Sequence, residues 1–185
     1  MIFDLPTSVE FGGESWEINT DYRDILRILL AFDDPELENP EKAAICLYNF
    51  YKTPEKIPRE LFQAAFDAAI AFIDRDQNDE RLGPRMMDWE QDAQLIFPAV
   101  NRVAGCEVRS MPYLHWWTFM GYFMEIRDST ASMVFSLRNK KFRGKKLEKW
   151  EREYWRQNIG ICNLKRKETA EEKAEKERLK ELLGG

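Results

Sequence analysis

The sequence has little histidine and few cysteines, and this scarcity argues against the common metal sites. It contains one histidine, His115, and three cysteines that lie far apart. No CxxC or HExxH spacing occurs, so we expect no zinc site. The run from Asp74 onward begins like a calcium-binding loop. However, Asp79 stands where that loop needs glycine, and Arg85 stands where it needs glutamate. We therefore expect no metal and no other cofactor.

The sequence also lacks the short motifs of nucleophilic and phosphate chemistry. It has no GxSxG elbow, no Walker A loop and no GxGxxG loop. His115 is unique and sits among aromatic residues, where a histidine more often belongs to the core or to a helix surface than to a catalytic group. A triad built from distant residues stays conceivable, but no motif points to one. We predict that the protein is not an enzyme.

Long apolar runs are missing as well. No uninterrupted apolar stretch is long enough to span a bilayer, so we expect no membrane partner. The opening MIFDLPTSVEF has neither the basic region nor the apolar run of a signal peptide. An odd number of separated cysteines is typical of reduced thiols in a cytosolic protein. These features together predict a cytosolic protein.

Charge is unevenly distributed along the chain. Residues 1–137 hold 12 basic and 24 acidic side chains, which gives 12 − 24 = −12. Residues 138–185 hold 16 basic and 9 acidic side chains, which gives 16 − 9 = +7. Two such parts can attract each other within one molecule or between copies, and the basic part can also meet an acidic partner.

What the sequence does contain is helical periodicity. Residues 7–19 predict a β-hairpin, because apolar residues alternate on both sides of Gly12-Gly13. Apolar spacing of three and four predicts helices in the segments that follow: 20–32, 41–51, 58–73, 86–105, 110–126, 128–142 and 145–159. We predict a mainly α protein, one domain over 1–164 with about six to seven helices. Residues 165–185 form a charged C-terminal helix or tail, which begins with Thr169 and Glu172 in capping-box spacing.

Several helix ends can be predicted from individual residues. Thr20, Asp88 and Ser110 have the side chains of N-caps for the first, fourth and fifth predicted helices. Pro98 is expected to kink or divide the fourth helix. Gly105 is a reasonable stop after it.

The stretch PYLHWWTFM, residues 112–120, concentrates aromatic side chains. Its rings recur at three and four on one side of the predicted helix, and further rings add a second side. Two such stripes predict a helix that is buried on more than one face, in the centre of the bundle. The alternative is an exposed Trp- and Met-rich face that binds apolar segments of a partner. We favour the core interpretation.

A basic run covers residues 138–156. Its first part carries these basic residues: Arg138, Lys140, Lys141, Arg143, Lys145 and Lys146. Interleaved with aromatic rings, they suit phosphate contacts and base stacking. However, three glutamates interrupt the run and the rest of the chain is acidic. We favour a solvated face whose rings, including Trp150 and Tyr154, point to the core, and we do not favour a nucleic-acid partner.

Three segments occur in order along the chain. They are DWEQDAQLIFPAVNR (88–102), LHWWTFMGYF (114–123) and FSLRNKK (135–141). In this order and spacing they resemble a family of small proteins from tailed phages and prophages of Gram-positive bacteria, encoded beside the tail tape-measure protein. The likeness extends over roughly residues 1–150 and does not reach the charged C-terminal segment.

The resemblance implies a non-enzymatic tail assembly chaperone in the host cytoplasm that binds the tape-measure protein, with the tail tube protein as a further partner. Two rivals are a structural component of the virion and a nucleic-acid-binding protein that uses residues 138–156. The family brings no catalytic residues.

The residues that match the family pattern are Asp88, Trp89, Asp92, His115, Trp116, Trp117 and Phe119. We hypothesise that they build a central helix pair, in which Trp89 packs on Trp116. Asp88 or Asp92 would accept a hydrogen bond from a histidine or tryptophan nitrogen. The same residues could instead form a partner-binding surface.

Overall fold

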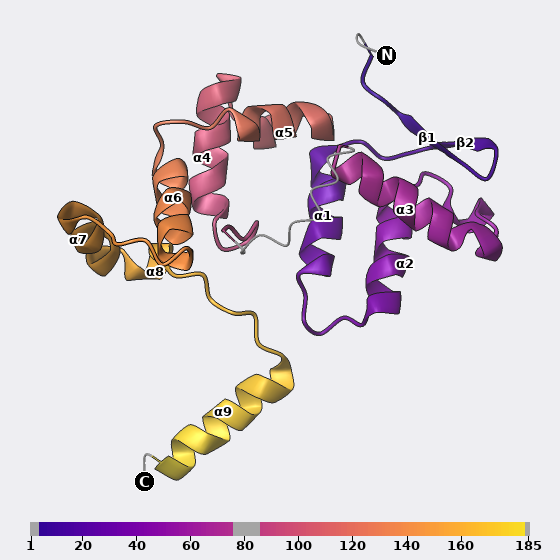
Figure 1. Cartoon of the computed structure of the whole chain (residues 1–185). Helices are drawn as coiled ribbons and strands as arrows, with labels where there is room; N and C mark the ends of the chain where they lie inside the picture. Colours follow the sequence, from indigo (N-terminus) through magenta and orange to yellow (C-terminus); the bar gives the residue numbers. More distant parts are fainter. Residues whose placement is uncertain (1–3, 76–85, 184–185) are drawn as a thin grey trace.

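The computed structural model describes residues 4–75 and 86–183, and the chain in these ranges is mainly helical. A small two-stranded antiparallel sheet precedes the helices (Figure 1), as the sequence predicted. The calcium-like run lies largely outside the described residues.

The hairpin consists of β1 (Ser8–Phe11) and β2 (Glu14–Glu17), in the register that pairs Val9 with Trp16. Gly12 and Gly13 have φ angles of 60° and 82°, which only glycine adopts without strain. A Cβ atom on Gly12 would lie 2.7 Å from a methyl group of Leu61. The turn therefore needs glycine for its backbone, and a side chain at position 12 would in addition displace the end of the Leu61 side chain.

The first helices form a compact group with the hairpin. They are α1 (Tyr22–Phe32), α2 (Asn39–Phe50) and α3 (Phe62–Ile73), with short 3-10 turns at Pro54–Lys56 and Arg59–Leu61. Asp21, not Thr20, caps α1, because the Asp21 carboxylate accepts the Arg23 N–H. The Thr20 hydroxyl instead lies 2.6 Å from the Tyr113 hydroxyl.

The aromatic stretch starts its helix later than predicted. α4 (Ala93–Ala104) runs through Pro98 without being divided and ends at Gly105, whose φ is 72°. A 3-10 turn (Val108–Ser110) and an extended segment follow, and α5 (Trp116–Met124) is capped by His115. Ser110 is therefore not its cap. Asp88 likewise does not cap α4, since its carboxylate accepts N–H groups of the turn before that helix.

The C-terminal part contains α6 (Thr130–Phe142), α7 (Lys149–Gln157), α8 (Ile159–Cys162) and α9 (Ala170–Leu183). In α7 the predicted apolar side is wrong for Trp150, which is 54% exposed while its neighbour Glu151 is buried; Leu147 and Tyr154 are partly buried. The capping box of α9 is confirmed: Thr169 and Glu172 each accept the backbone N–H of the other. α9 points away from the rest of the chain (Figure 1).

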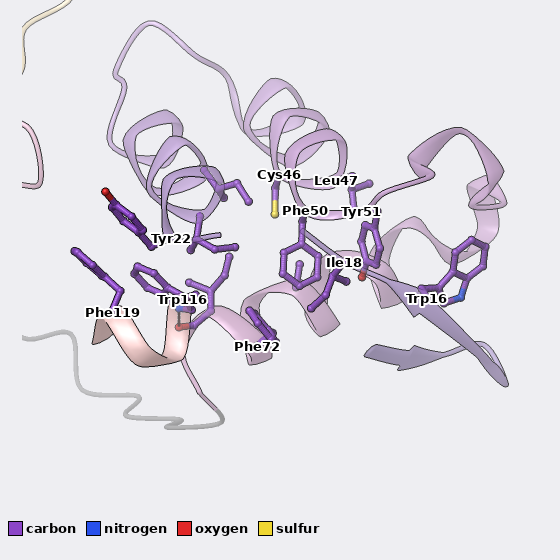
Figure 2. Close-up of a cluster of buried hydrophobic side chains, with 14 of the residues drawn as sticks. Trp16, Ile18, Tyr22, Cys46, Leu47, Phe50, Tyr51, Phe72, Trp116 and Phe119 are labelled. Carbon is purple, nitrogen blue, oxygen red and sulfur yellow. Dashed lines mark hydrogen bonds between the residues drawn. The ribbon is translucent and has the colours of Figure 1, made fainter. Parts of the chain in front are cut away.

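One cluster of apolar side chains joins the hairpin to α1–α5. Figure 2 shows its rings: Phe50, Tyr51 and Phe72 lie between Trp16 at one end and Trp116 at the other. The ring of Tyr22 stacks on Phe119 with centroids 4.5 Å apart. The core therefore belongs mainly to the first two thirds of the chain.

Candidate functional site

Most side chains of the family pattern are buried in this core. Trp116 is 2% exposed and Phe119 is 0% exposed, and Asp88, Asp92 and His115 are also buried. Trp89 and Trp117 are partly buried. The rings of Trp89 and Trp116 lie 6.3 Å apart in an edge-to-face arrangement, but Trp89 lies in the turn before α4 and not on a helix. These residues act as architecture in the described chain.

The adjacent tryptophans hold the end of α3. The indole N–H of Trp116 donates to the carbonyl of Ile73 at 2.9 Å, and that of Trp117 donates to the carbonyl of Phe72 at 3.0 Å. The last carbonyls of a helix have no partner inside the helix. The indole N–H of Trp116 satisfies the Ile73 carbonyl, and that of Trp117 adds a second donor to the Phe72 carbonyl, which also accepts the backbone N–H of Arg75 at 3.2 Å. The two rings thereby fix α5 against α3.

His115 has a structural position. Its Nδ1 accepts the backbone N–H of Trp117 at 3.0 Å, which caps α5. Its Nε2 lies 3.0 Å from the carbonyl oxygen of Pro6, so the neutral ring carries its hydrogen on Nε2 and donates there. Both nitrogens are engaged with backbone groups, which is not the arrangement of a general base.

The predicted hydrogen bond from a histidine or tryptophan nitrogen to Asp88 or Asp92 is wrong for the motif on α5. The Nε2 of His115 and the indole nitrogens of Trp116 and Trp117 contact backbone oxygens, and the Nδ1 of His115 accepts the backbone N–H of Trp117. Helix-end carbonyls are nearer and otherwise unsatisfied, and Asp92 has a stronger partner, described next.

Asp92 forms a buried ion pair with Arg138 of α6. Two guanidinium nitrogens of Arg138 donate to the two carboxylate oxygens of Asp92, at 2.6 and 2.9 Å. The remaining N–H groups donate to the carbonyls of Met86, Ile161 and Cys162. All five donors of the guanidinium are satisfied, which a buried arginine requires. Arg138 therefore joins the turn before α4 to α6 and α8, and it is not a surface cation as the sequence suggested.

The next basic residues are also partly engaged. The Lys140 ammonium donates to Glu151 of α7, and this hydrogen bond holds the pKa of the Glu151 carboxyl below its usual value. The Lys141 ammonium lies 4.2 Å from the ring centre of Trp155. By contrast, Arg143, Lys145 and Lys146 are exposed.

An apolar groove was missed by the sequence analysis. It has a volume of about 920 Å³ and lies between α2 and α3, with Phe32 at the end of α1. Its walls include Ala44, Leu47, Phe62 and Phe66. The sequence of α3, FQAAFDAAIAFI, could have indicated the groove, because it is apolar on more than one face of the helix. In the structure, Phe62 of this helix is 42% exposed. Exposed apolar surface of this kind marks a binding site.

Within residues 4–75 and 86–183, no group of three or more histidine, cysteine or acidic side chains is placed to hold a metal ion. No described helix combines the length and the apolar character needed to cross a bilayer. Burial raises the pKa of the Cys46 thiol to about 12, so this cysteine is an inert core residue.

Comparisons with known proteins gave one family. No curated protein and no solved structure matches the chain. A family model described as Bacteriophage Gp15 protein matches residues 1–164, which include the hairpin, the aromatic core and the Arg138 ion pair. The match ends before the charged C-terminal helix. The chain belongs to the Bacteriophage Gp15 protein family.

Proposed function

We propose that this phage protein is a non-enzymatic tail assembly protein that binds the tape-measure protein as a chaperone in the host cytoplasm. The observation that carries the proposal is the apolar groove between α2 and α3. Membership in a phage family agrees with it. The sequence resemblance to proteins encoded beside the tape-measure gene is the reason for naming this partner.

The groove suits an apolar helical segment. Each of its two flanking helices has 12 residues, so each is about 18 Å long. A partner helix that presents residues at i, i+3, i+4 and i+7 can lie along such a groove. A long helical tape-measure chain has apolar segments that would aggregate before the tail tube encloses it. Covering these segments is the chaperone task, and the tube protein is the partner that would then replace the chaperone.

Co-expression with the neighbouring tape-measure protein tests the proposal. We expect the tape-measure chain to become soluble and to co-purify with this protein. The substitutions Ala44→Glu and Phe62→Glu place charges in the groove and should abolish co-purification while the circular dichroism spectrum stays unchanged. Val103→Glu, at an exposed apolar position on α4, is the matched control. Retained binding by the groove variants would contradict the proposal.

A structural role in the virion is the alternative that remains. Mass spectrometry of purified particles separates the two roles. A chaperone is absent from mature particles or present in trace amounts, whereas a structural component is present in stoichiometric amounts.

A further inference from the structure

The C-terminal arm, residues 165–183, is held to the rest of the chain at its base. The backbone N–H of Lys165 donates to the side-chain oxygen of Gln91 at 3.0 Å, and the Gln91 amide donates back to the Lys165 carbonyl at 2.9 Å. The Lys167 ammonium pairs with the carboxylate of Glu90 at 3.2 Å. These contacts with the turn before α4 fix the point at which the arm leaves the body.

Beyond its base the arm lies in solvent. α9 points away from the body (Figure 1), and none of those α9 residues whose side chains the structure describes is buried. Leu179 is 51% exposed. The ion pair of Lys176 with Glu168 joins two side chains of the arm to each other. An isolated helix of 14 residues is marginal in water, so α9 gains stability when an apolar surface covers one side of it.

The sequence of α9 supplies one apolar side near its end. Leu179, Leu182 and Leu183 follow the i, i+3, i+4 spacing, which belongs to one face of a helix. Charged residues fill most of the other positions of α9. Such a sequence is typical of a helix that inserts a short apolar face into a groove and keeps its charged faces in water.

The groove between α2 and α3 is an apolar surface that lies next to the base of the arm. The backbone N–H of Ala170 donates to the carboxylate of Glu36, in the loop that joins α1 to α2. Phe32 and Asn39, which stand on either side of this loop, both line the groove. α2 is about 18 Å long and α9 is about 21 Å long. The arm and the groove therefore match in length and in apolar character.

We propose that α9 of one copy occupies the groove between α2 and α3 of a second copy. The arm directs α9 away from its own body, so its leucines meet the groove of a neighbour rather than their own. Because the base of the arm lies beside the groove, two copies related by a twofold axis can exchange arms and fill both grooves. The inference rests on the groove of the proposed function and adds a competitor to it, since a tape-measure segment must then displace α9.

Sedimentation velocity on the full chain tests the exchange of arms. The average mass of the wild type should rise towards that of a dimer as the protein concentration increases. The dimer should persist at about 500 mM salt, because salt screens charges and does not weaken apolar contacts. Leu179→Glu and Ala44→Glu should each weaken dimerisation by about tenfold or more, since each places a carboxylate in the apolar contact.

Ala174→Glu is the matched control for Leu179→Glu. Both substitutions add one negative charge at an exposed position of α9, but the two positions lie about 140° apart around the helix. Ala174→Glu should therefore leave dimerisation unchanged. An equimolar mixture of the Leu179→Glu and Ala44→Glu variants should form heterodimers, because one intact arm then meets one intact groove. Thermal melts establish that each variant is folded.

A wild type that stays monomeric at every concentration overturns the proposal, as does a dimer that Leu179→Glu leaves intact. Equal losses in Leu179→Glu and Ala174→Glu also contradict it, because the charge of the arm and not its leucines would then matter. The test needs no tape-measure protein, so the inference and the proposed function can fail separately. Tape-measure binding by a strictly monomeric protein would remove the inference alone. An arm-exchanged dimer that binds no tape-measure chain would remove the proposed function alone.

Discussion

The two parts of the molecule are stabilised in different ways. From the hairpin to α5, aromatic rings pack on one another, and tryptophan N–H groups satisfy the end of α3. From α6 to α8, a smaller group of buried apolar residues (Ala131, Val134, Leu137 and Cys162) is combined with a buried arginine and a lysine–glutamate pair, while Phe142 and Trp150 remain on the surface. Burial of apolar area tolerates many sequences, whereas a buried ion pair needs particular partners. This difference indicates that the stability of the C-terminal part depends on a few specific residues. Its exposed rings are not needed for packing and are available for other contacts.

Removing Arg138 should have the largest effect on the free energy of unfolding. Arg138→Leu removes the donors of three backbone carbonyls and both guanidinium donors of the Asp92 carboxylate, which keeps the backbone N–H of Asp88. Breaking a buried pair costs about 3–5 kcal/mol. We expect a loss at the upper end of this range in urea unfolding. Arg138→Met combined with Asp92→Leu should recover part of it, since no charge is then left buried alone. A double variant no more stable than Arg138→Leu would mean that the carbonyl bonds, not the ion pair, matter.

Substitutions of two tryptophans, one in each part of the molecule, compare how much each ring contributes to stability. Trp116→Ala should lower the free energy of unfolding by about 3–5 kcal/mol, because it removes a buried ring and leaves the Ile73 carbonyl unsatisfied. Trp150→Ala should change it by less than about 0.5 kcal/mol, because the ring is exposed. Chemical denaturation measures both. Equal losses would show that the contrast between a packed and an exposed aromatic region does not hold.

The cap of α5 gives a smaller effect. His115→Ala removes the acceptor for the Trp117 N–H and should cost about 1–2 kcal/mol. His115→Asn keeps an acceptor at the same position and should recover much of the loss. If both variants are equally unstable, the contact with Pro6 is the more important one.

Acid should loosen the C-terminal part through Glu151. The pKa of this carboxyl is lowered in the folded state by the hydrogen bond from Lys140. Its stabilising contribution is therefore complete above the ordinary carboxyl pKa and is lost as the pH falls through the lowered value. The protection factors of the α7 amides, which are corrected for the pH dependence of intrinsic exchange, should fall over this range in the wild type. The fall should be absent in Glu151→Gln, which is less protected at every pH.

The sequence predicted those features that depend on local chemistry. Gly12-Gly13 specifies the hairpin turn, and Thr169 with Glu172 specifies the start of α9. The predicted start of α5 at Ser110 is wrong, although serine has a side chain that suits an N-cap. Residues 114–116 instead form backbone bonds with the chain before α1, where Tyr22 donates to Leu114 and Trp116 donates to Thr20. Such long-range pairing needs an extended chain and overrides the local preference.

Other features depended on contacts between distant residues. Arg138 is one cation among many in its run, and only folding brings it to Asp92. The periodicity of α7 predicted that Trp150 is buried. Instead, the ion pair with Lys140 holds Glu151 on the buried side of α7, and Trp150 faces the solvent. The groove requires two helices and the end of a third, so no single segment reveals it beyond the doubly apolar α3.

The bonds of Arg138 also have a consequence for synthesis on the ribosome. Its acceptors Met86 and Asp92 precede it in the chain, but the carbonyls of Ile161 and Cys162 follow 23 and 24 residues later. At about 5–20 residues per second, the guanidinium waits for roughly one to five seconds with two N–H groups still hydrated. The aromatic part can fold before then, because α5 has already emerged. The C-terminal part therefore closes last, and a released chain that ends before Ile161 would retain an ordered aromatic core while Arg138 lacks two of its carbonyl acceptors.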